Sequence, residues 1–330
     1  MKKTAIIGFG FMGMTHAINI LKIGDLQLSA IVERDLSVIE RNLGSGIGNI
    51  ATGNVSAKSL GNVSHYTDID ECFRKEELDA VIICTHVNTH FEIARKALAK
   101  GLNVFIEKPF CLNVSEAKEL VALAGSSGKV LMIGHVVRFM PPYQLLKSWI
   151  DSREFGEPEF LTFSRFCGYP GWGQWNEKNV RDLSGGALFD LVLHDIDFAA
   201  SLAGGPGIIK SVCLPGAYSN HDYVSALWEY KNSNLKVKID GGFTYHKAYP
   251  FNAGYTARFE KASVLYSTLS GDIIRIADNN NVREIPSGDA GAGYFNEMVY
   301  FVECLKNGTV PMKCSPESSL EAIELCYKHI

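Results

Sequence analysis

Three polar residues in the second half of the chain have a spacing that could support proton transfer. Asp190, His194 and Asp197 stand four and three positions apart in the mostly apolar run GGALFDLVLHDID. On a helix these positions share one face. A carboxylate one helical turn from a histidine can fix the tautomer of the imidazole and stabilise its protonated form. The pattern therefore fits either a general base or a buried structural network.

A lysine stands where a buried strand is predicted to end. Lys108 and Pro109 follow Glu107 and the apolar run at residues 103–106. Ligands of open parallel sheets lie outside the carboxyl ends of the strands, so we expect Lys108 to point into such a crevice. There it could exchange a proton with a substrate hydroxyl or carbonyl oxygen. The alternative is a solvated lysine at a strand end.

The glycine-rich start of the chain predicts dinucleotide binding. Residues 8–13, GFGFMG, fit G-x-G-x-x-G between a predicted strand at residues 4–8 and a predicted helix at residues 12–23. The glycines allow a tight turn and let a pyrophosphate approach the helix N-terminus. Glu33 ends the next predicted strand and is placed for the ribose hydroxyls, which favours NAD. Arg34 beside it could hold a 2′-phosphate, so NADP remains possible.

The elements around these residues predict two unlike halves. Apolar strands alternate with helices in the first half, which predicts a parallel sheet covered on both faces. Successive strands with tight turns predict a mostly antiparallel open sheet in the second half. We therefore expect an α/β fold with a Rossmann domain at residues 1–135 and an α+β substrate domain at residues 136–330. Further first-half strands are predicted at residues 26–32, 79–84, 103–106 and 130–133, and helices at residues 88–100 and 113–124. Second-half strands are predicted at residues 158–166, 208–219, 222–230, 235–245, 254–268, 272–277 and 282–286, and helices at residues 186–203, 294–306 and 316–329. Residues 44–64 are rich in Gly, Ser and Asn and predict an insertion at the rim.

Composition limits the kinds of partner. The 330 residues suit roughly two domains of ~150 residues each. With 32 basic and 36 acidic residues the net charge is −4, and no basic excess points to nucleic acid. No apolar stretch reaches the ~18 residues of a membrane span, so we expect a cytoplasmic protein. The eight cysteines show no C-x-x-C or zinc-ligand spacing, which predicts free thiols and no metal site.

In their order and spacing, GFGFMG, EKP and GGALFDLVLHDID resemble the glucose–fructose oxidoreductase, inositol dehydrogenase and rhizopine-catabolism (Gfo/Idh/MocA) family. The stretch ICTHVNTHFEIARKALAKGLNVFIEKPF resembles the family segment that leads to its catalytic lysine, and GHVVRFMPPYQLLK resembles its crossover into the second domain. The resemblance covers nearly the whole chain. It implies an NAD(P)-dependent oxidoreductase acting on a sugar, cyclitol or related polyol.

The resemblance also implies residue roles. Lys108 would contact the substrate oxygen and the nicotinamide, and His194 would be the acid/base. Asp190 would bind or orient the substrate, and Asp197 would orient the histidine. Arg165, His246 and Lys247 could reach substrate from the sheet. The expected cofactor residues are Gly8, Gly10, Phe11, Met12, Gly13, Glu33, Arg34, Thr85, His86, Asn88, His90, Glu107, Lys108 and Trp175.

The sequence departs from the family pattern at His86, where a proline is common, and at Ala187, which replaces a third glycine. Neither change removes a catalytic group. The family implies a homodimer or homotetramer formed through the second-half sheet. Two other functions stay open: an NAD-dependent glycosidase that works by transient oxidation, and a nucleotide-sensing binding protein. The intact Lys108, Asp190 and His194 argue against the sensor.

Overall fold

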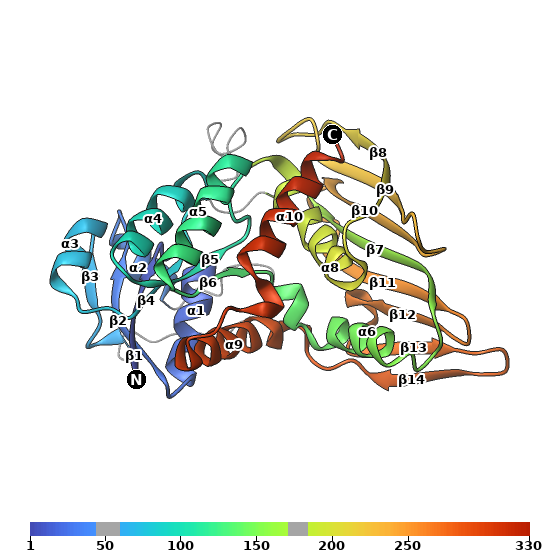
Figure 1. The fold of residues 1–330 in the computed structure, drawn as a ribbon, viewed down its shortest axis with the longest axis horizontal. Coiled ribbons are helices and arrows are strands. Elements are labelled where there is room, and N and C mark those ends of the chain that lie inside the picture. The colour runs from blue at the N-terminus through green and yellow to red at the C-terminus, as the bar shows by residue number, and fades with distance from the viewer. Residues whose placement is uncertain (44–59, 171–183) are drawn as a thin grey trace. The chain divides into compact units, whose positions relative to one another are not determined.

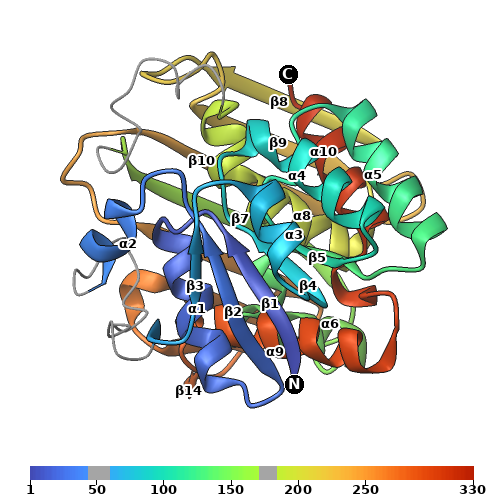
Figure 2. The same ribbon diagram turned by 90° about the vertical axis from the view of Figure 1, so that its left-hand side faces the viewer.

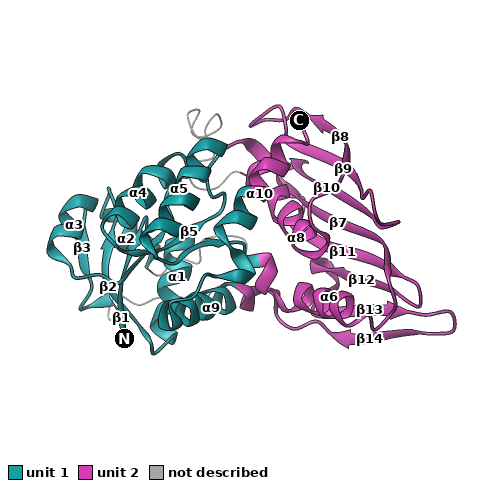
Figure 3. Cartoon of the chain, in the orientation of Figure 1, with its two compact units in different colours: residues 1–136, 294–320 teal, residues 137–293, 321–330 magenta. Residues whose placement is uncertain are grey.

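A computed structural model describes residues 1–43, 60–170 and 184–330 (Figure 1). Its contacts divide the chain into two compact units (Figure 3). Unit 1 contains residues 1–136 and 294–320, and unit 2 contains residues 137–293 and 321–330. The chain thus returns to unit 1 late in the sequence, which a single cut after residue 135 does not anticipate. That cut into cofactor and substrate domains stays a prediction.

Unit 1 is built on a six-stranded sheet in the order β3-β2-β1-β4-β5-β6, with every neighbouring pair parallel (Figure 2). The order reverses between β1 and β4, and ligands of such sheets bind at the carboxyl ends of the strands beside this switch point. All four residues of β4 are fully buried, as expected for a sheet covered on both faces. The strands are β1 (Lys2–Ile7), β2 (Leu26–Val32), β3 (Ser64–Tyr66), β4 (Ala80–Ile83), β5 (Asn103–Glu107) and β6 (Leu131–Gly134).

Two helices of unit 1, α3 and α5, begin at residues with known capping preferences. The side chain of Asp68 accepts a hydrogen bond from the backbone N–H of Glu71 at the start of α3, and Asn113 does the same for α5. Gly128 ends α5 in the left-handed conformation, with φ of 63°. The helices are α1 (Phe11–Lys22), α2 (Ser37–Asn42), α3 (Ile69–Lys75), α4 (Val87–Ala99), α5 (Val114–Ser127) and α9 (Gly293–Asn307).

Unit 2 is built on an eight-stranded sheet in the order β14-β13-β12-β11-β7-β10-β9-β8. Within this sheet, β7 and β10 form the only parallel pair among the described strands, and the other neighbouring pairs are antiparallel. These two sheets confirm the predicted fold class. The strands are β7 (Pro158–Gly168), β8 (Ile208–Leu214), β9 (Tyr223–Glu229), β10 (Lys236–Tyr245), β11 (Asn252–Phe259), β12 (Ser263–Ser267), β13 (Ile273–Ala277) and β14 (Val282–Pro286). The helices of unit 2 are α6 (Pro141–Ser152) and α8 (Leu193–Ala203), and α10 (Pro316–Tyr327) begins in unit 1 and ends in unit 2.

Aromatic side chains join the helices of unit 2 to one face of its sheet. Tyr143 of α6 packs edge-on against Phe198 of α8 and Tyr255 of β11, with ring centroids 5.1 and 5.4 Å apart. All three rings are buried. The Tyr255 hydroxyl donates to the carbonyl of Pro142 at 2.8 Å, so a buried polar group is also satisfied. The strands alternate buried residues with half-buried or exposed ones, so the other face of the sheet is the less covered of the two.

The predicted elements agree with the structure except at a few places. The single strand predicted over residues 254–268 is wrong, because a turn after Phe259 separates β11 from β12. The short elements α2, α3 and β3 and the helix α6 were not predicted. Of the proposed insertion, residues 44–59 lie outside the described residues. All eight cysteines are free thiols. Among the described residues, no helix combines the length and apolar character that crossing a membrane requires.

Candidate functional site

The glycine loop between β1 and α1 has the backbone that a dinucleotide needs. Gly8 has φ of 90°, which side chains of L-residues rarely adopt. A Cβ on Gly13 would lie 2.1 Å from the carbonyl oxygen of Gly8, so α1 can pack on the loop only with glycine there. Gly10 is exposed, and a Cβ on it would meet nothing within 4 Å. The backbone at Gly10 is therefore open to a pyrophosphate.

The N-terminus of α1 fits the same ligand. Gly10 occupies the N-cap, and no side chain caps the helix there. The first N–H groups of an α-helix have no partner within the helix, and together with the helix dipole they favour an anion. This contrasts with α3 and α5, whose caps are filled by Asp68 and Asn113.

Glu33 lies at the carboxyl end of β2, beside the glycine loop. Its Oε2 atom accepts a hydrogen bond from the backbone N–H of Phe9 at 2.8 Å. Its own backbone N–H donates to the carbonyl of Tyr66, which fixes the residue to the end of β3. Arg34 is exposed. The carboxylate is thus held where the sequence places the ribose hydroxyls.

The carboxyl ends of β1, β4 and β5 lie at the same edge of the sheet. Ile7, Ile83 and Ile106 pair across β1, β4 and β5, so the residues after them emerge side by side. Thr85 is half-buried, whereas His86 and Asn88 are exposed. These three residues follow β4, as predicted for a cofactor-lining loop. Their contacts with a cofactor stay a prediction.

His90 joins the loops after β4 and β5. Its ring nitrogens lie 2.9 Å from the carbonyl oxygen of Pro109 and 3.0 Å from that of Thr85. The side chain is buried, and burial lowers the pKa of the imidazole, so the neutral ring donates to one of these carbonyls. His90 therefore connects the loop after β4 to the loop after β5. Direct contact with the cofactor stays a prediction.

Lys108 follows β5 and is half-buried. Its backbone N–H donates to Oε2 of Glu107 at 3.2 Å. The other oxygen of Glu107 lies 2.6 Å from Nε2 of His16 on α1. The backbone of the candidate catalytic lysine is therefore tied through Glu107 to the helix that follows the glycine loop.

The helix predicted over residues 186–203 is present, but its start is not a regular α-helix. Leu188–Val192 form a π-helical turn, labelled η4, that leads into α8. Asp190 lies in this turn and His194 in the first turn of α8, and both are half-buried. Single π-turns are rare in proteins, and those that occur are often found at functional sites. The wider turn changes the regular spacing on which the one-faced cluster was predicted.

Two buried arginine–aspartate pairs fix α8. Asp197 accepts hydrogen bonds from Nε and Nη2 of Arg138, at 2.7 and 2.5 Å. Asp195 accepts two from Arg165 of β7, both at 2.9 Å. The roles predicted for Asp197 on the histidine and for Arg165 on substrate stay predictions. Arg138 was missed by the sequence analysis, although a cation in the apolar run VVRFM was a signal.

The loop before β9 holds the start of the π-turn. Asp222 is fully buried, and its carboxylate accepts from the backbone N–H groups of Ala187, Tyr218 and Ser219 at 3.3, 2.6 and 3.0 Å. A Cβ on Gly186 would lie 1.9 Å from Oγ of Ser219. The absence of a side chain at Gly186 therefore lets the loop that carries Ser219 and Asp222 pack against the start of the π-turn. Asp222 was also missed, and no sequence signal pointed to it.

The remaining predicted residues fall elsewhere. His246 and Lys247 are exposed after β10. Trp175 lies outside the described residues. Their proposed contacts with substrate or nicotinamide stay predictions.

Comparisons with known proteins match both halves. A family model described as "Oxidoreductase family, NAD-binding Rossmann fold" matches residues 2–135, and one for the GFO/IDH/MocA C-terminal domain matches residues 143–264. A scyllo-inositol 2-dehydrogenase (NAD(+)) of Bacillus subtilis (strain 168) is 26% identical over 323 residues, covering 94% of this chain and 88% of that protein. A D-glucoside 3-dehydrogenase of Escherichia coli (strain K12) is 30% identical over 213 residues, covering 64% of this chain and 56% of that protein.

Solved structures share the fold. A levoglucosan dehydrogenase in complex with NADH and levoglucosan superposes with a TM-score of 0.83 over 99% of this chain and 95% of that chain. The two are 17% identical, so this likeness shows the fold alone.

Proposed function

Because this chain belongs to the Gfo/Idh/MocA family of NAD-binding oxidoreductases, we propose that it transfers a hydride between nicotinamide and a sugar, cyclitol or related polyol. The observation that carries the proposal is the place of Lys108, one residue beyond β5, on the sheet edge where the glycine loop follows β1. The scyllo-inositol and D-glucoside dehydrogenases among its relatives support the substrate class.

The proposal divides the reaction between cofactor and protein. Bound NAD supplies the hydride acceptor, and the protein supplies orientation and proton transfer. In the oxidation direction Lys108 binds the reacting hydroxyl oxygen and stabilises the charge that develops on it. Lys108 and His194 are the acid/base groups, and either His194 or Lys108 takes the hydroxyl proton. Asp190 binds or orients the substrate, and Asp197 holds the geometry of the histidine through α8.

We propose NAD as the preferred cofactor. A carboxylate at Glu33 can accept hydrogen bonds from both ribose hydroxyls, and it repels a 2′-phosphate. The bond from Phe9 keeps this carboxylate beside the loop. Arg34 is exposed next to it and is the residue through which NADP could still bind.

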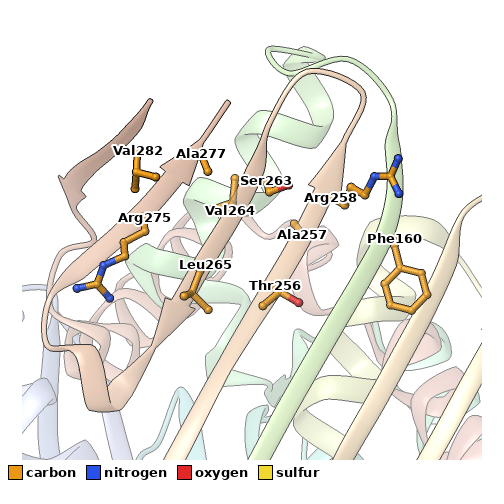
Figure 4. A pocket seen from close by; sticks show the side chains of 10 residues that line it. All are labelled: Phe160, Thr256, Ala257, Arg258, Ser263, Val264, Leu265, Arg275, Ala277 and Val282. Carbon is orange, nitrogen blue, oxygen red and sulfur yellow. The ribbon is translucent and has the colours of Figure 1, made fainter. Parts of the chain in front are cut away.

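We also propose that the less covered face of the unit 2 sheet forms contacts between copies of the chain. Figure 4 shows a shallow pocket on this face, lined by residues that include Phe160, Leu265 and Val282. Their exposed fractions are 36%, 40% and 68%. Arg258 and Arg275 also line the pocket, so the proposed contact combines exposed apolar side chains with charged ones, as at the rim of many subunit contacts. The occupant proposed is a second copy, giving a homodimer or homotetramer.

A direct test mixes purified protein with NAD or NADP and a panel of scyllo-inositol, myo-inositol, methyl glucosides and levoglucosan. The proposal predicts NADH formation with at least one member and a higher melting temperature with NAD than with NADP. Release of sugar from a glycoside without net NADH would support the glycosidase instead. Tight NAD binding without turnover of any member would support the sensor.

A further inference from the structure

A buried cluster beneath the candidate catalytic lysine has no role in the proposed chemistry. It consists of His16 on α1, Glu107 at the end of β5 and Glu297 on α9. The ligand atoms of the three side chains lie within 4.8 Å of one another, and all three residues are buried. Residues from three elements far apart in sequence thus meet in the core of unit 1.

The two carboxyl groups of this cluster have very different surroundings. Glu107 lies 2.6 Å from Nε2 of His16 and accepts a bond from the backbone N–H of Lys108. Glu297 is fully buried, and neither of its oxygens has a hydrogen-bond partner among the described residues. An ionised carboxylate in such a place is strongly disfavoured, because nothing replaces its lost hydration.

We propose that Glu297 is a neutral carboxylic acid, so that Glu107 is the single charged carboxylate of the cluster and, held by His16, positions the backbone at Lys108. The cluster then carries the charge of one carboxylate, not two, which is how paired carboxyl groups settle when they share a site. Glu297 and His16 are positioning residues in this proposal, because they act through Glu107. The inference rests on the proposed function only in its catalytic part.

The groups that face Glu297 favour its neutral form. Glu107 comes from β5, His16 from α1, and Cys84 from the residue after β4. Burial first and the charge of Glu107 second raise the pKa of Glu297 well above its usual range. Burial also raises the pKa of Cys84, so its thiol adds no charge near neutral pH. Phe105 packs edge-on against both His16 and Phe301, which keeps the surroundings apolar.

A bound divalent cation is the rival explanation for two carboxylates and a histidine. The 2.6 Å between His16 Nε2 and Glu107 Oε1 is a hydrogen-bond length. Two ligands of a tetrahedral zinc ion, each at about 2.0–2.1 Å, would lie about 3.3 Å apart. The hydrogen-bonded reading therefore fits the distance better, and metal content becomes an outcome of the test.

The first arm of the test needs no substrate. Glu297→Gln keeps the shape of the neutral acid and cannot ionise. An acid with a raised pKa in the folded state makes the protein progressively less stable as pH rises above the unfolded value, 4.5 for Glu. The melting temperature of Glu297→Gln should therefore rise relative to that of wild type as pH increases from about 5 to about 9. Glu303→Gln removes an exposed carboxylate from the same helix and should show no such trend.

The second arm measures turnover with the panel member that wild type oxidises fastest. Glu297→Gln should keep kcat within about 3-fold, whereas Glu297→Leu, which puts an apolar side chain beside the charged carboxylate of Glu107, should lower kcat about 10-fold or more with little change in KM. A structural role alone predicts equal kcat for the two variants.

Three results would overturn the proposal: a melting-temperature difference that does not change with pH, a Glu297→Gln enzyme as slow as Glu297→Leu, or a transition-metal ion in purified protein that Glu297→Gln loses. If wild type oxidises no panel member, the proposed function fails, and the first arm still decides whether Glu297 is neutral.

Discussion

The carboxylate of Glu33 accepts a hydrogen bond from the backbone N–H of Phe9 at 2.8 Å, which ties the end of β2 to the glycine loop after β1. The residue proposed to select the cofactor and the loop proposed to bind its phosphates are thus one connected structure. A change at Glu33 should alter both the affinity for NAD and the discrimination against NADP.

Glu33→Ala is expected to raise the Kd for NAD about 10-fold or more, because hydrogen bonds to a charged group contribute about 1.5–3 kcal/mol. The Kd for NADP should rise less or fall, since the repulsion of the 2′-phosphate is lost. Calorimetric titration with both cofactors measures this. Glu40→Ala, an exposed change on α2, is the control. An unchanged Kd for NAD would remove Glu33 from the ribose site.

The pair between Arg138 and Asp197 should dominate the stability of unit 2. Asp197→Asn removes the carboxylate that accepts from the largely buried guanidinium of Arg138, and breaking such a pair costs about 3–5 kcal/mol. The matched control is Glu157→Gln, which removes the exposed pair with Arg153 and should cost about 1 kcal/mol or less. Urea denaturation measures both. An equal loss of unfolding free energy in the two variants would show that the buried pair stabilises the protein no more than the exposed pair does.

Acid should weaken the anchoring of the C-terminus. Nε1–H of Trp228 donates to Nε2 of His329 at 2.9 Å, and Nδ1 of His329 lies 2.7 Å from the carbonyl of Leu325. The ring is therefore neutral with its proton on Nδ1. Burial lowers the pKa of His329, so its contribution is present above the unfolded value of 6.5 and is lost as pH falls through the folded value.

The free energy of unfolding of wild type should therefore decrease below about pH 6.5, and His329→Gln should flatten that dependence. Denaturation followed by tryptophan fluorescence at several pH values checks it. The exposed His65→Gln variant should keep the wild-type slope. A His329→Gln slope equal to wild type would contradict the assignment.

The less covered face of the unit 2 sheet should govern self-association. Leu265→Glu and Val282→Glu place charges on apolar, exposed positions of β12 and β14, and like charges across a symmetric contact would repel. Light scattering should show a smaller particle for the double variant than for wild type. Glu substitution at Ile208, exposed on the opposite edge strand β8, tests whether the effect is specific. A wild-type monomer would contradict the proposed contact.

The parallel sheet of unit 1 could be predicted closely from the sequence. Its strands are continuous apolar runs bounded by glycines and helices, and β2 was predicted at its observed bounds. The strand β3 was missed because it has only three residues, too few for a period to show. The helix α6 was missed because residues 141 and 142 are both proline, which reads as a break although proline suits the first turn of a helix.

The candidate site was predicted in its residues but not in its interactions. Lys108, Asp190 and His194 stand out by position and spacing along the chain. The Arg138–Asp197 pair and the His16–Glu107–Glu297 cluster join residues that lie at least 59 positions apart in the sequence, and only the fold brings them together. The π-turn at Leu188–Val192 was also invisible, because apolar periodicity does not distinguish it from a regular helical turn.

The most direct test of the account is the turnover of Lys108→Ala with NAD and the best polyol of the panel, followed by NADH formation. We predict that kcat falls about 100-fold or more, as expected for lost acid/base help. Lys100→Ala, an exposed change at the end of α4, should behave as wild type. A kcat for Lys108→Ala near that of wild type would contradict the assignment of Lys108 and the mechanism built on it.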